Sequence, residues 1–123
     1  MATARKVAVP RRGDVFVVSF DPTLGAEIRK TRPALVVQND IANRFSPITI
    51  VAAITSQFDS KLYPTEILIE TPEAGLERDS VVLLNQVRSI DRQRLIRRLG
   101  RVTAETMRHV ERALAISMGL VEI

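Results

Sequence analysis

Residues 48–55 read ITIVAAIT, a run with no charged residue, glycine or proline. A short segment this rich in isoleucine, valine and threonine is typical of a β-strand. Because the residues between Thr49 and Thr55 are apolar at every position rather than at alternate ones, we expect both faces of the strand to be buried. The run therefore predicts a central strand of a sheet near the middle of the chain.

Segments of the same kind lie on both sides of this run. We predict strands at GDVFVVSF (13–20), PALVVQN (33–39), TEILIE (65–70) and SVVLLNQVRSI (80–90), since each is rich in β-branched residues and bounded by turn residues. Pro33 suits the first position of a strand, where no amide hydrogen is needed. The connections are loops or connectors (21–31, 40–47 and 56–64) rather than crossover helices, so the sheet is expected to be antiparallel.

The C-terminal part of the chain changes to a helical period. DRQRLIRR (91–98) is predicted to form a short helix capped by Asp91, and a longer helix is expected from the N-cap Thr103 to Gly119. Its apolar stripe is expected to pack on the core, and His109 to face solvent. The stripe consists of Met107, Val110, Leu114 and Met118. The predicted fold class is mainly β (α+β), with five or so short antiparallel strands curled into a small barrel and a C-terminal helix.

Length and composition restrict the possible functions. A chain of 123 residues is expected to form one domain, 1–123, with residues 1–12 as a flexible N-terminal arm. The absence of cysteine excludes disulfides, zinc–thiolate sites and thiol nucleophiles, and a single histidine excludes a multi-histidine metal site. We expect neither a metal nor a cofactor. No apolar run is long enough to span a membrane, and no signal peptide is evident, so a cytoplasmic protein is expected.

The balance of charge leaves two interpretations open. Eighteen basic and fourteen acidic residues give a net charge of +4, and all but three of the cations are arginines. Arginine suits phosphate and carboxylate, which favours an anionic partner. A solvated, arginine-rich surface explains the same composition equally well.

Polar side chains gather at the predicted strand ends. In an antiparallel barrel several strand ends meet at one rim, so these residues are expected to line a single groove, with Arg29 and Lys30 on its lip. Such a groove suits single-stranded RNA, which carries its own nucleophile in the 2′-hydroxyl group. Each residue also has a purely structural explanation, such as strand propensity or a hydrogen bond to a neighbouring loop. The set is Arg32, Asn39, Asp40, Thr55, Ser56, Gln57, Asn85, Gln86 and Arg88.

Several segments together resemble a known family. RRGDVFVVSFDPTLGAEIRKTRPALVVQND (11–40), NRFSPITIVAAIT (43–55) and ERDSVVLLNQVRSID (77–91) resemble the MazF/PemK toxin family, and are most similar to its chromosomal branch from Gram-positive bacteria. The resemblance covers about residues 11–120. The order of the motifs is specific, although no single motif is.

The resemblance implies both a fold and an activity. It implies an SH3-like antiparallel barrel with short helices and a C-terminal helix, acting as a homodimer. The implied activity is that of a toxin from a type II toxin–antitoxin system: a sequence-specific, metal-independent endoribonuclease. Such an enzyme cleaves single-stranded RNA, chiefly mRNA, by attack of the 2′-hydroxyl and thereby inhibits translation. A cognate MazE-like antitoxin is implied as partner, with its C-terminal segment blocking the groove.

By position, the resemblance implies that Arg32 and Thr55 are the catalytic pair. It further implies RNA contacts at Glu27, Asn39, Phe45, Ser56 and Gln86. Because arginine stays protonated, Arg32 is a poor base, and we expect it to act on the phosphate mainly by electrostatics or, in an unusual environment, as a general acid. The group that takes the proton from the 2′-hydroxyl is left open by the sequence.

Three positions depart from relatives, and two other functions remain open. The plasmid-borne Kid branch places an acid and an arginine where this chain has Asn85 and Leu83, so its mechanism does not transfer. Ala26 replaces a residue that is often serine or histidine. A gyrase-poisoning toxin of the CcdB type shares the barrel but ends in Trp-Gly-Ile, whereas this chain ends LVEI. A non-catalytic RNA-binding module is the other alternative.

Overall fold

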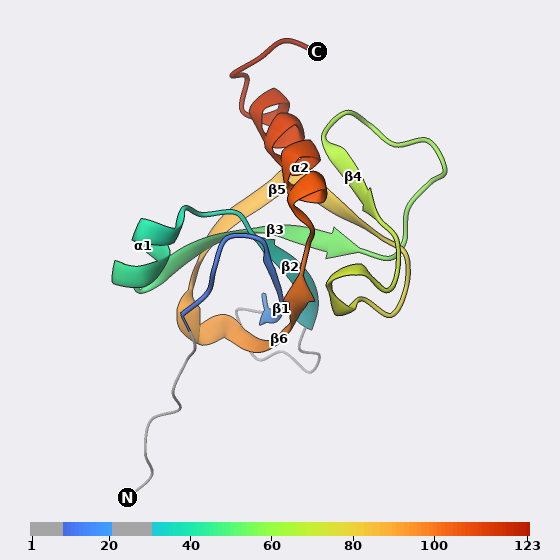
Figure 1. Ribbon diagram of the computed structural model, residues 1–123. Coiled ribbons are helices and arrows are strands. Elements are labelled where there is room, and N and C mark those ends of the chain that lie inside the picture. Colours follow the sequence, from blue (N-terminus) through green and yellow to red (C-terminus); the bar gives the residue numbers. More distant parts are fainter. Residues whose placement is uncertain (1–8, 21–30) are drawn as a thin grey trace, which may run out of the picture.

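The computed structural model describes residues 9–20 and 31–123. A curled antiparallel sheet of six strands, in the order β4-β5-β3-β2-β1-β6, forms most of the molecule (Figure 1). The strands are β1 (Asp14–Ser19), β2 (Thr31–Val36), β3 (Ile48–Thr55), β4 (Glu66–Ile69), β5 (Ser80–Asp91) and β6 (Leu95–Arg101). The helices are α1 (Asp40–Phe45), α2 (Ala104–Ser117) and two 3₁₀ turns, η1 (Glu73–Gly75) and η2 (Arg92–Arg94).

The central strand is confirmed with the bounds that the sequence predicts. β3 covers Ile48–Thr55 and lies between β5 and β2, and its residues Val51–Ile54 are buried. Burial on both faces explains why this run lacks the alternation of a half-exposed strand. The mainly β fold with a C-terminal helix is likewise confirmed.

The prediction of a helix over residues 91–98 is wrong beyond its first turn. Asp91 does act as a cap, since its side chain accepts a hydrogen bond from the Gln93 amide at 2.8 Å, but η2 ends at Arg94. The chain then continues as β6, which pairs with β1. The local sequence favours a helix here, but pairing with β1 determines the conformation. Strand formation depends more on such contacts than on the intrinsic preference of the residues.

Three further expectations are corrected by the structure. Residues 40–47, expected as a connector, contain α1, whose N-cap Asn39 accepts a hydrogen bond from the Ala42 amide at 2.8 Å. Asn85, Gln86 and Arg88 lie within β5 and not at a strand end, because β5 continues to Asp91. Strand β2 also begins earlier than expected, at Thr31.

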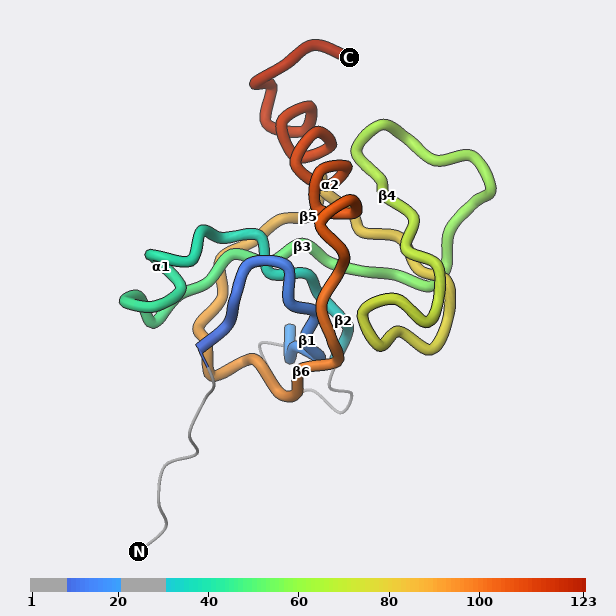
Figure 2. Tube along the Cα trace, in the orientation of Figure 1, coloured from blue at the N-terminus to red at the C-terminus, as the bar shows by residue number. Residues whose placement is uncertain are grey.

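A bulge bends β5 at these polar residues. Ala53 of β3 pairs with Leu83, whereas the preceding Ala52 pairs with Val87, so that Leu84–Gln86 lie outside the regular ladder. Extra residues in one strand of a pair bend that strand and increase its twist. Figure 2 shows the result: the β5 trace arcs around the sheet toward β6.

Apolar side chains cover both faces of the sheet. On one face a cluster that includes Leu35 and Ile54 packs against α2, through Met107, Val110 and Ala113. On the other face Phe16, Val36 and neighbours pack against Ile90 and Leu95. Burial on both faces explains why the central strands read as apolar runs.

The C-terminal helix agrees with the sequence except at its end. The Thr103 hydroxyl caps α2 by accepting a hydrogen bond from the Thr106 amide at 3.1 Å, and Gly119 has a positive φ of 75° just beyond the helix. His109 is exposed, as expected. The prediction that Met118 packs on the core is wrong: it is 64% exposed, because it follows the last helical residue.

The N-terminal segment is described only from residue 9, so most of the predicted arm 1–12 lies outside the described residues. At its end, the Arg12 amide donates to Asp40 Oδ1 at 2.7 Å and the guanidinium donates to Val37 O and Glu111 Oε2. Arg12 thereby joins β2, α1 and α2. None of the helices within residues 9–20 and 31–123 is long and apolar enough to cross a membrane.

Asp40 gives a prediction about acid stability. The hydrogen bond from the Arg12 amide lowers the pKa of Asp40 below its usual value, with a further contribution from the Asn43 side chain. A lowered folded-state pKa stabilises the fold above the ordinary carboxyl pKa, and this stabilisation is lost as pH falls through the lower value. Asp40→Asn is therefore expected to lower the free energy of unfolding at pH 7 by less than about 1 kcal/mol, since solvent screens this exposed group.

Urea unfolding of both proteins between pH 7 and pH 3 measures this effect. The difference between them is expected to shrink below about pH 4. A difference that stays constant over this range would show that the ionisation of Asp40 contributes nothing.

Candidate functional site

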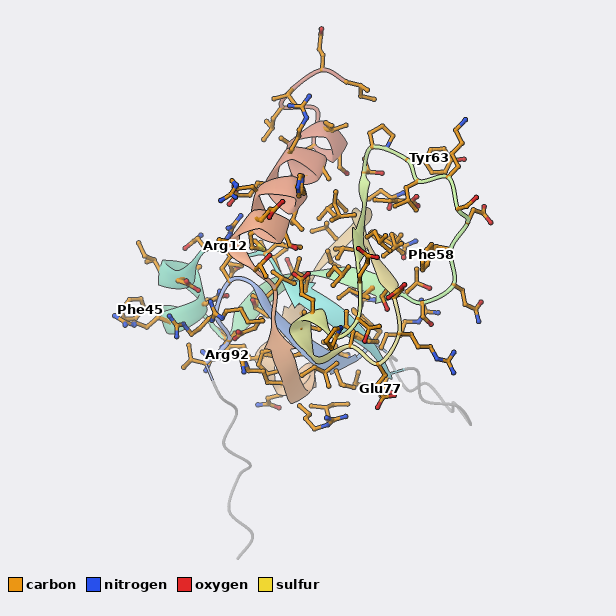
Figure 3. The ribbon with its side chains drawn as sticks, turned by 45° about the vertical axis from the view of Figure 1, so that its right-hand side comes forward. Arg12, Phe45, Phe58, Tyr63, Glu77 and Arg92 are labelled. Carbon is orange, nitrogen blue, oxygen red and sulfur yellow. The ribbon has the colours of Figure 1, made fainter. Side chains whose placement is uncertain are left out.

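An open groove of about 510 Å³ lies where β2, β3 and the bulge of β5 come together. We call it the Arg32 groove. Its volume is in the range of ordinary ligand sites. Part of its wall is the β3–β4 loop, which carries Phe58 and Tyr63 in Figure 3. The lining residues are Arg32, Thr55, Gln57, Phe58, Asp59, Lys61, Tyr63, Glu66, Leu83 and Gln86.

The register of β2 against β3 brings Arg32 and Thr55 together in this groove. β2 pairs with β3 from Val36↔Val51 to Ala34↔Ala53, and the ladder stops before Pro33, which has no amide hydrogen to donate. Continuing the same register by two residues brings Arg32 opposite Thr55. On its other side β2 stays paired with β1 as far as Thr31, so the backbone of Arg32 is still held in the sheet. The two side chains therefore stand on a fixed backbone just beyond the end of a ladder.

The Thr55 hydroxyl is already engaged with the loop that follows it. Its oxygen accepts a hydrogen bond from the Gln57 amide at 3.1 Å and donates to the Gln57 carbonyl at 3.3 Å. The second bond is long, so this proton can turn toward a ligand oxygen in the groove at small cost. Thr55 thus has a structural role at the start of the β3–β4 loop, and its hydroxyl hydrogen can still be donated to a ligand in the groove.

The charges of the described residues that line the groove balance. Arg32 and Lys61 contribute two positive charges, and Asp59 and Glu66 contribute two negative ones. Within the described part of the chain the Arg32 guanidinium makes no hydrogen bond or ion pair, and the residue is exposed. Its charge is therefore available to an anion in the groove.

The β3–β4 loop contributes residues that the sequence interpretation did not select. Phe58 and Tyr63 are 40% and 72% exposed, and both line the groove. Glu66 Oε1 accepts a hydrogen bond from the Tyr63 amide at 2.9 Å, which fixes the end of the loop to β4. The sequence signal that could have identified these residues is the presence of two aromatic residues in one loop. Exposed aromatic rings are typical surfaces for stacking bases.

The remaining sequence-predicted residues are spread over three places. Gln86 lines the Arg32 groove, whereas Ser56 lines a neighbouring cavity next to Pro33. The Asn39 side-chain oxygen is used to cap α1. Phe45 is 77% exposed beside Arg92, on the opposite side of the molecule from Tyr63 (Figure 3). Glu27, Arg29 and Lys30 lie outside the described residues, as does Ala26.

Solved structures with the same fold are numerous. A MazE–MazF structure from Deinococcus radiodurans (Form-II) has a TM-score of 0.78 and 28% identity, covering 93% of this chain and 99% of that chain. A mycobacterial endoribonuclease in complex with its cognate antitoxin has a TM-score of 0.76 over 93% of this chain and 99% of that chain; at 24% identity this similarity concerns the fold alone.

The sequence relatives are closer. The chain is 46% identical over 114 residues to a protein of Bacillus subtilis (strain 168) named Endoribonuclease EndoA, covering 93% of this chain and 98% of that protein. Residues 11–118 also match the family model described as the PemK-like, MazF-like toxin of type II toxin–antitoxin system. A match over most of the chain, together with the shared fold, shows that this chain belongs to the PemK-like, MazF-like family of toxins of type II toxin–antitoxin systems.

Proposed function

We propose that this toxin is a sequence-specific endoribonuclease that cleaves single-stranded RNA, chiefly mRNA, at the Arg32 groove. The observation that carries the proposal is the 46% identity to a named endoribonuclease over nearly its whole length. The groove supports it, because the two residues with the expected catalytic character, Arg32 and Thr55, line one cavity. An open groove whose lining includes aromatic and amide side chains and two cations, beside two carboxylates, fits an unpaired RNA strand.

The proposed reaction uses the nucleophile of the RNA itself. The 2′-hydroxyl oxygen loses its proton and attacks the adjacent phosphorus, and the bond to the 5′-oxygen of the next nucleotide breaks. The departing 5′-oxygen takes a proton from water in the open groove, so that a 2′,3′-cyclic phosphate and a 5′-hydroxyl remain. Arg32 stabilises the negative charge that grows on the phosphate oxygens, and Thr55 donates a hydrogen bond to one of them. A carboxylate of the groove, Asp59 or Glu66, is the kind of group that can accept the 2′-hydroxyl proton.

The proposed partners follow from the family. A MazE-like antitoxin would occupy the groove with its C-terminal segment, and the toxin would act as a cytoplasmic homodimer. Gln86 would contact RNA within the groove, and Asn39, Phe45 and Ser56 would do so outside it. Glu27, Arg29 and Lys30 complete the proposed set of RNA-binding residues.

Incubation of the purified protein with a long single-stranded RNA in excess EDTA tests the proposal. We expect discrete cuts at one short sequence, which mapping of the ends would define. Intact RNA, with the protein shown to be folded, would contradict the proposal. RNA binding without cleavage would then favour a non-catalytic module. The gyrase-poisoning alternative has no observation in its favour.

Thr55 can be separated into its two roles by substitution. Thr55→Ala is expected to lower the rate of cleavage at least about 10²-fold, because it removes one donor to the transition state. Loss of the hydrogen bonds to Gln57 is expected to cost only about 1 kcal/mol of stability. Thr55→Ser keeps the hydroxyl and is the matched control.

Single-turnover cleavage and thermal unfolding measure the two effects separately. A Thr55→Ala protein that cleaves normally but unfolds far more easily would assign Thr55 a structural role only.

A further inference from the structure

A second cavity opens beside the Arg32 groove, between η1 and the sheet. We call this cavity the η1 pocket; its volume is about 320 Å³. Its apolar lining comes from Val17 of β1, Pro33 of β2, Leu99 of β6 and Leu76, which follows η1. The volume lies within the range of small-molecule sites, and the apolar lining suits a flat ring.

The η1 pocket and the Arg32 groove share one wall. Pro33 and Ser56 line the pocket, whereas their chain neighbours Arg32 and Thr55 line the groove. Successive residues of an extended chain face opposite sides, so the adjoining ends of β2 and β3 separate the two cavities. The two cavities therefore lie next to each other, on either side of the same pair of strand ends.

Two glycines hold the back of the η1 pocket in shape. A Cβ atom at Gly75 would collide with the Leu99 carbonyl oxygen, and one at Gly100 would lie 2.6 Å from the Ala74 carbonyl carbon. Glycine at both positions lets η1 lie directly on the backbone of β6, and Gly75 also supplies the positive φ of 73° that the turn needs. The wall of the pocket is therefore formed by packed backbone.

The rim of the η1 pocket carries an excess of positive charge. Arg78 and Arg97 contribute two cations and Glu77 contributes one carboxylate, which leaves a net charge of +1. Among the described residues neither guanidinium has a hydrogen bond or an ion pair, and both residues are exposed. Glu77 lies on the same side of the molecule as Phe58 of the groove (Figure 3). An apolar cavity with free guanidinium groups at its rim is suited to a nucleotide, which combines a ring with a phosphate.

We infer that the η1 pocket receives the base of a nucleotide adjacent to the cleaved phosphate, with Arg78 and Arg97 holding the neighbouring phosphate. This inference rests on the proposed ribonuclease function. It makes the pocket a determinant of which sequence is cut, separate from the Arg32 and Thr55 side chains. Apolar contact of a base with the pocket lining and ion pairing at its rim contribute to binding independently.

The first test measures binding of a labelled RNA oligonucleotide that contains the mapped cut sequence. A 2′-deoxy nucleotide on the 5′ side of the cut prevents the reaction. Arg78→Gln and Arg97→Gln are each expected to weaken binding about 10-fold and to reduce the slope of log K against log salt by about 0.7. Arg108→Gln, which removes the same charge from α2, is the control and is expected to change binding less than about 2-fold.

The second test locates the base. Removing the base from either nucleotide that flanks the cut is expected to weaken wild-type binding about 10-fold at one of the two positions. Val17→Phe would place a ring in the η1 pocket and so exclude the base. In this variant, removal of the same base is therefore expected to change the binding affinity little. Thermal unfolding shows whether each variant is folded. If Val17→Phe does not fold, the binding of Arg78→Gln and Arg97→Gln alone tests the inference.

The outcomes separate the two proposals. Arginine variants that bind like Arg108→Gln, together with no effect of either missing base, would overturn the role of the η1 pocket while cleavage at the mapped site still stands. Wild-type protein that neither cuts nor binds RNA would overturn the ribonuclease function and this inference with it.

Discussion

Arg32→Ala is expected to lower kcat/KM for RNA cleavage about 10³-fold and to leave the fold intact. Arg32 lines the groove in which we propose that the phosphate binds, and removal of one preorganised group that stabilises transition-state charge typically costs about 10²–10³-fold. Because Arg32 is exposed and makes no hydrogen bond or ion pair within the described residues, its removal is expected to change the melting temperature little.

The matched substitutions for this experiment are Arg32→Lys and Arg108→Ala. Lysine keeps the charge but loses the planar pair of donors, so partial activity is expected. Arg108 lies on α2, which lines neither the groove nor the η1 pocket, and its loss is expected to leave kcat/KM unchanged within about 2-fold. Near-normal cleavage by Arg32→Ala would show that Arg32 takes no part in the reaction.

Asn43→Ala is expected to be the most destabilising of the proposed substitutions, by about 3–5 kcal/mol. Asn43 is fully buried, and its side chain joins three others around it. Its nitrogen donates to Gln38 O at 2.9 Å and to Asp40 Oδ1 at 3.2 Å, and its oxygen accepts from Thr49 Oγ1 at 2.8 Å and Gln38 Nε2 at 2.9 Å. Alanine would leave the buried Thr49 hydroxyl and the half-buried groups of Gln38 without these partners, and each such group costs about 1–3 kcal/mol.

Thermal and urea unfolding measure the effect of Asn43→Ala. A decrease in melting temperature of about 10–20 °C is expected, since a chain of this size loses roughly 4 °C per kcal/mol. Asn85→Ala is the control, because Asn85 is exposed in β5. Equal melting temperatures for the two variants would show that the network around Asn43 contributes no net stability.

The sequence predicts the strands well where burial alone decides them. The bounds of β3 are those of its apolar run. Asp91 and Thr103 cap η2 and α2 as predicted, whereas the cap of α1 by Asn39 was not predicted. β6 was missed because its pairing with β1 is a non-local contact that leaves no periodic signal in LIRRLGR. α1 was missed because it is only six residues long.

The candidate site is predictable only in part. That Arg32 and Thr55 line one groove follows from the register of β2 against β3, of which only the end of the ladder, at Pro33, is visible in the sequence. Gln86 reaches the groove because of the bulge that takes it out of the ladder between β3 and β5. No local sequence motif predicts that bulge. The η1 pocket depends on the contact between η1 and β6, more than twenty residues apart, which a reading of local patterns cannot find.

The most direct measurement compares two oligonucleotides that contain the mapped cut sequence, one entirely RNA and one with a 2′-deoxy nucleotide on the 5′ side of the cut. Both are incubated with wild-type protein in excess EDTA, and the ends of any products are identified. We expect the RNA to yield a 2′,3′-cyclic phosphate and a 5′-hydroxyl, and the 2′-deoxy oligonucleotide to remain intact although it binds. Cleavage of the 2′-deoxy oligonucleotide at the same position would contradict attack by the 2′-hydroxyl.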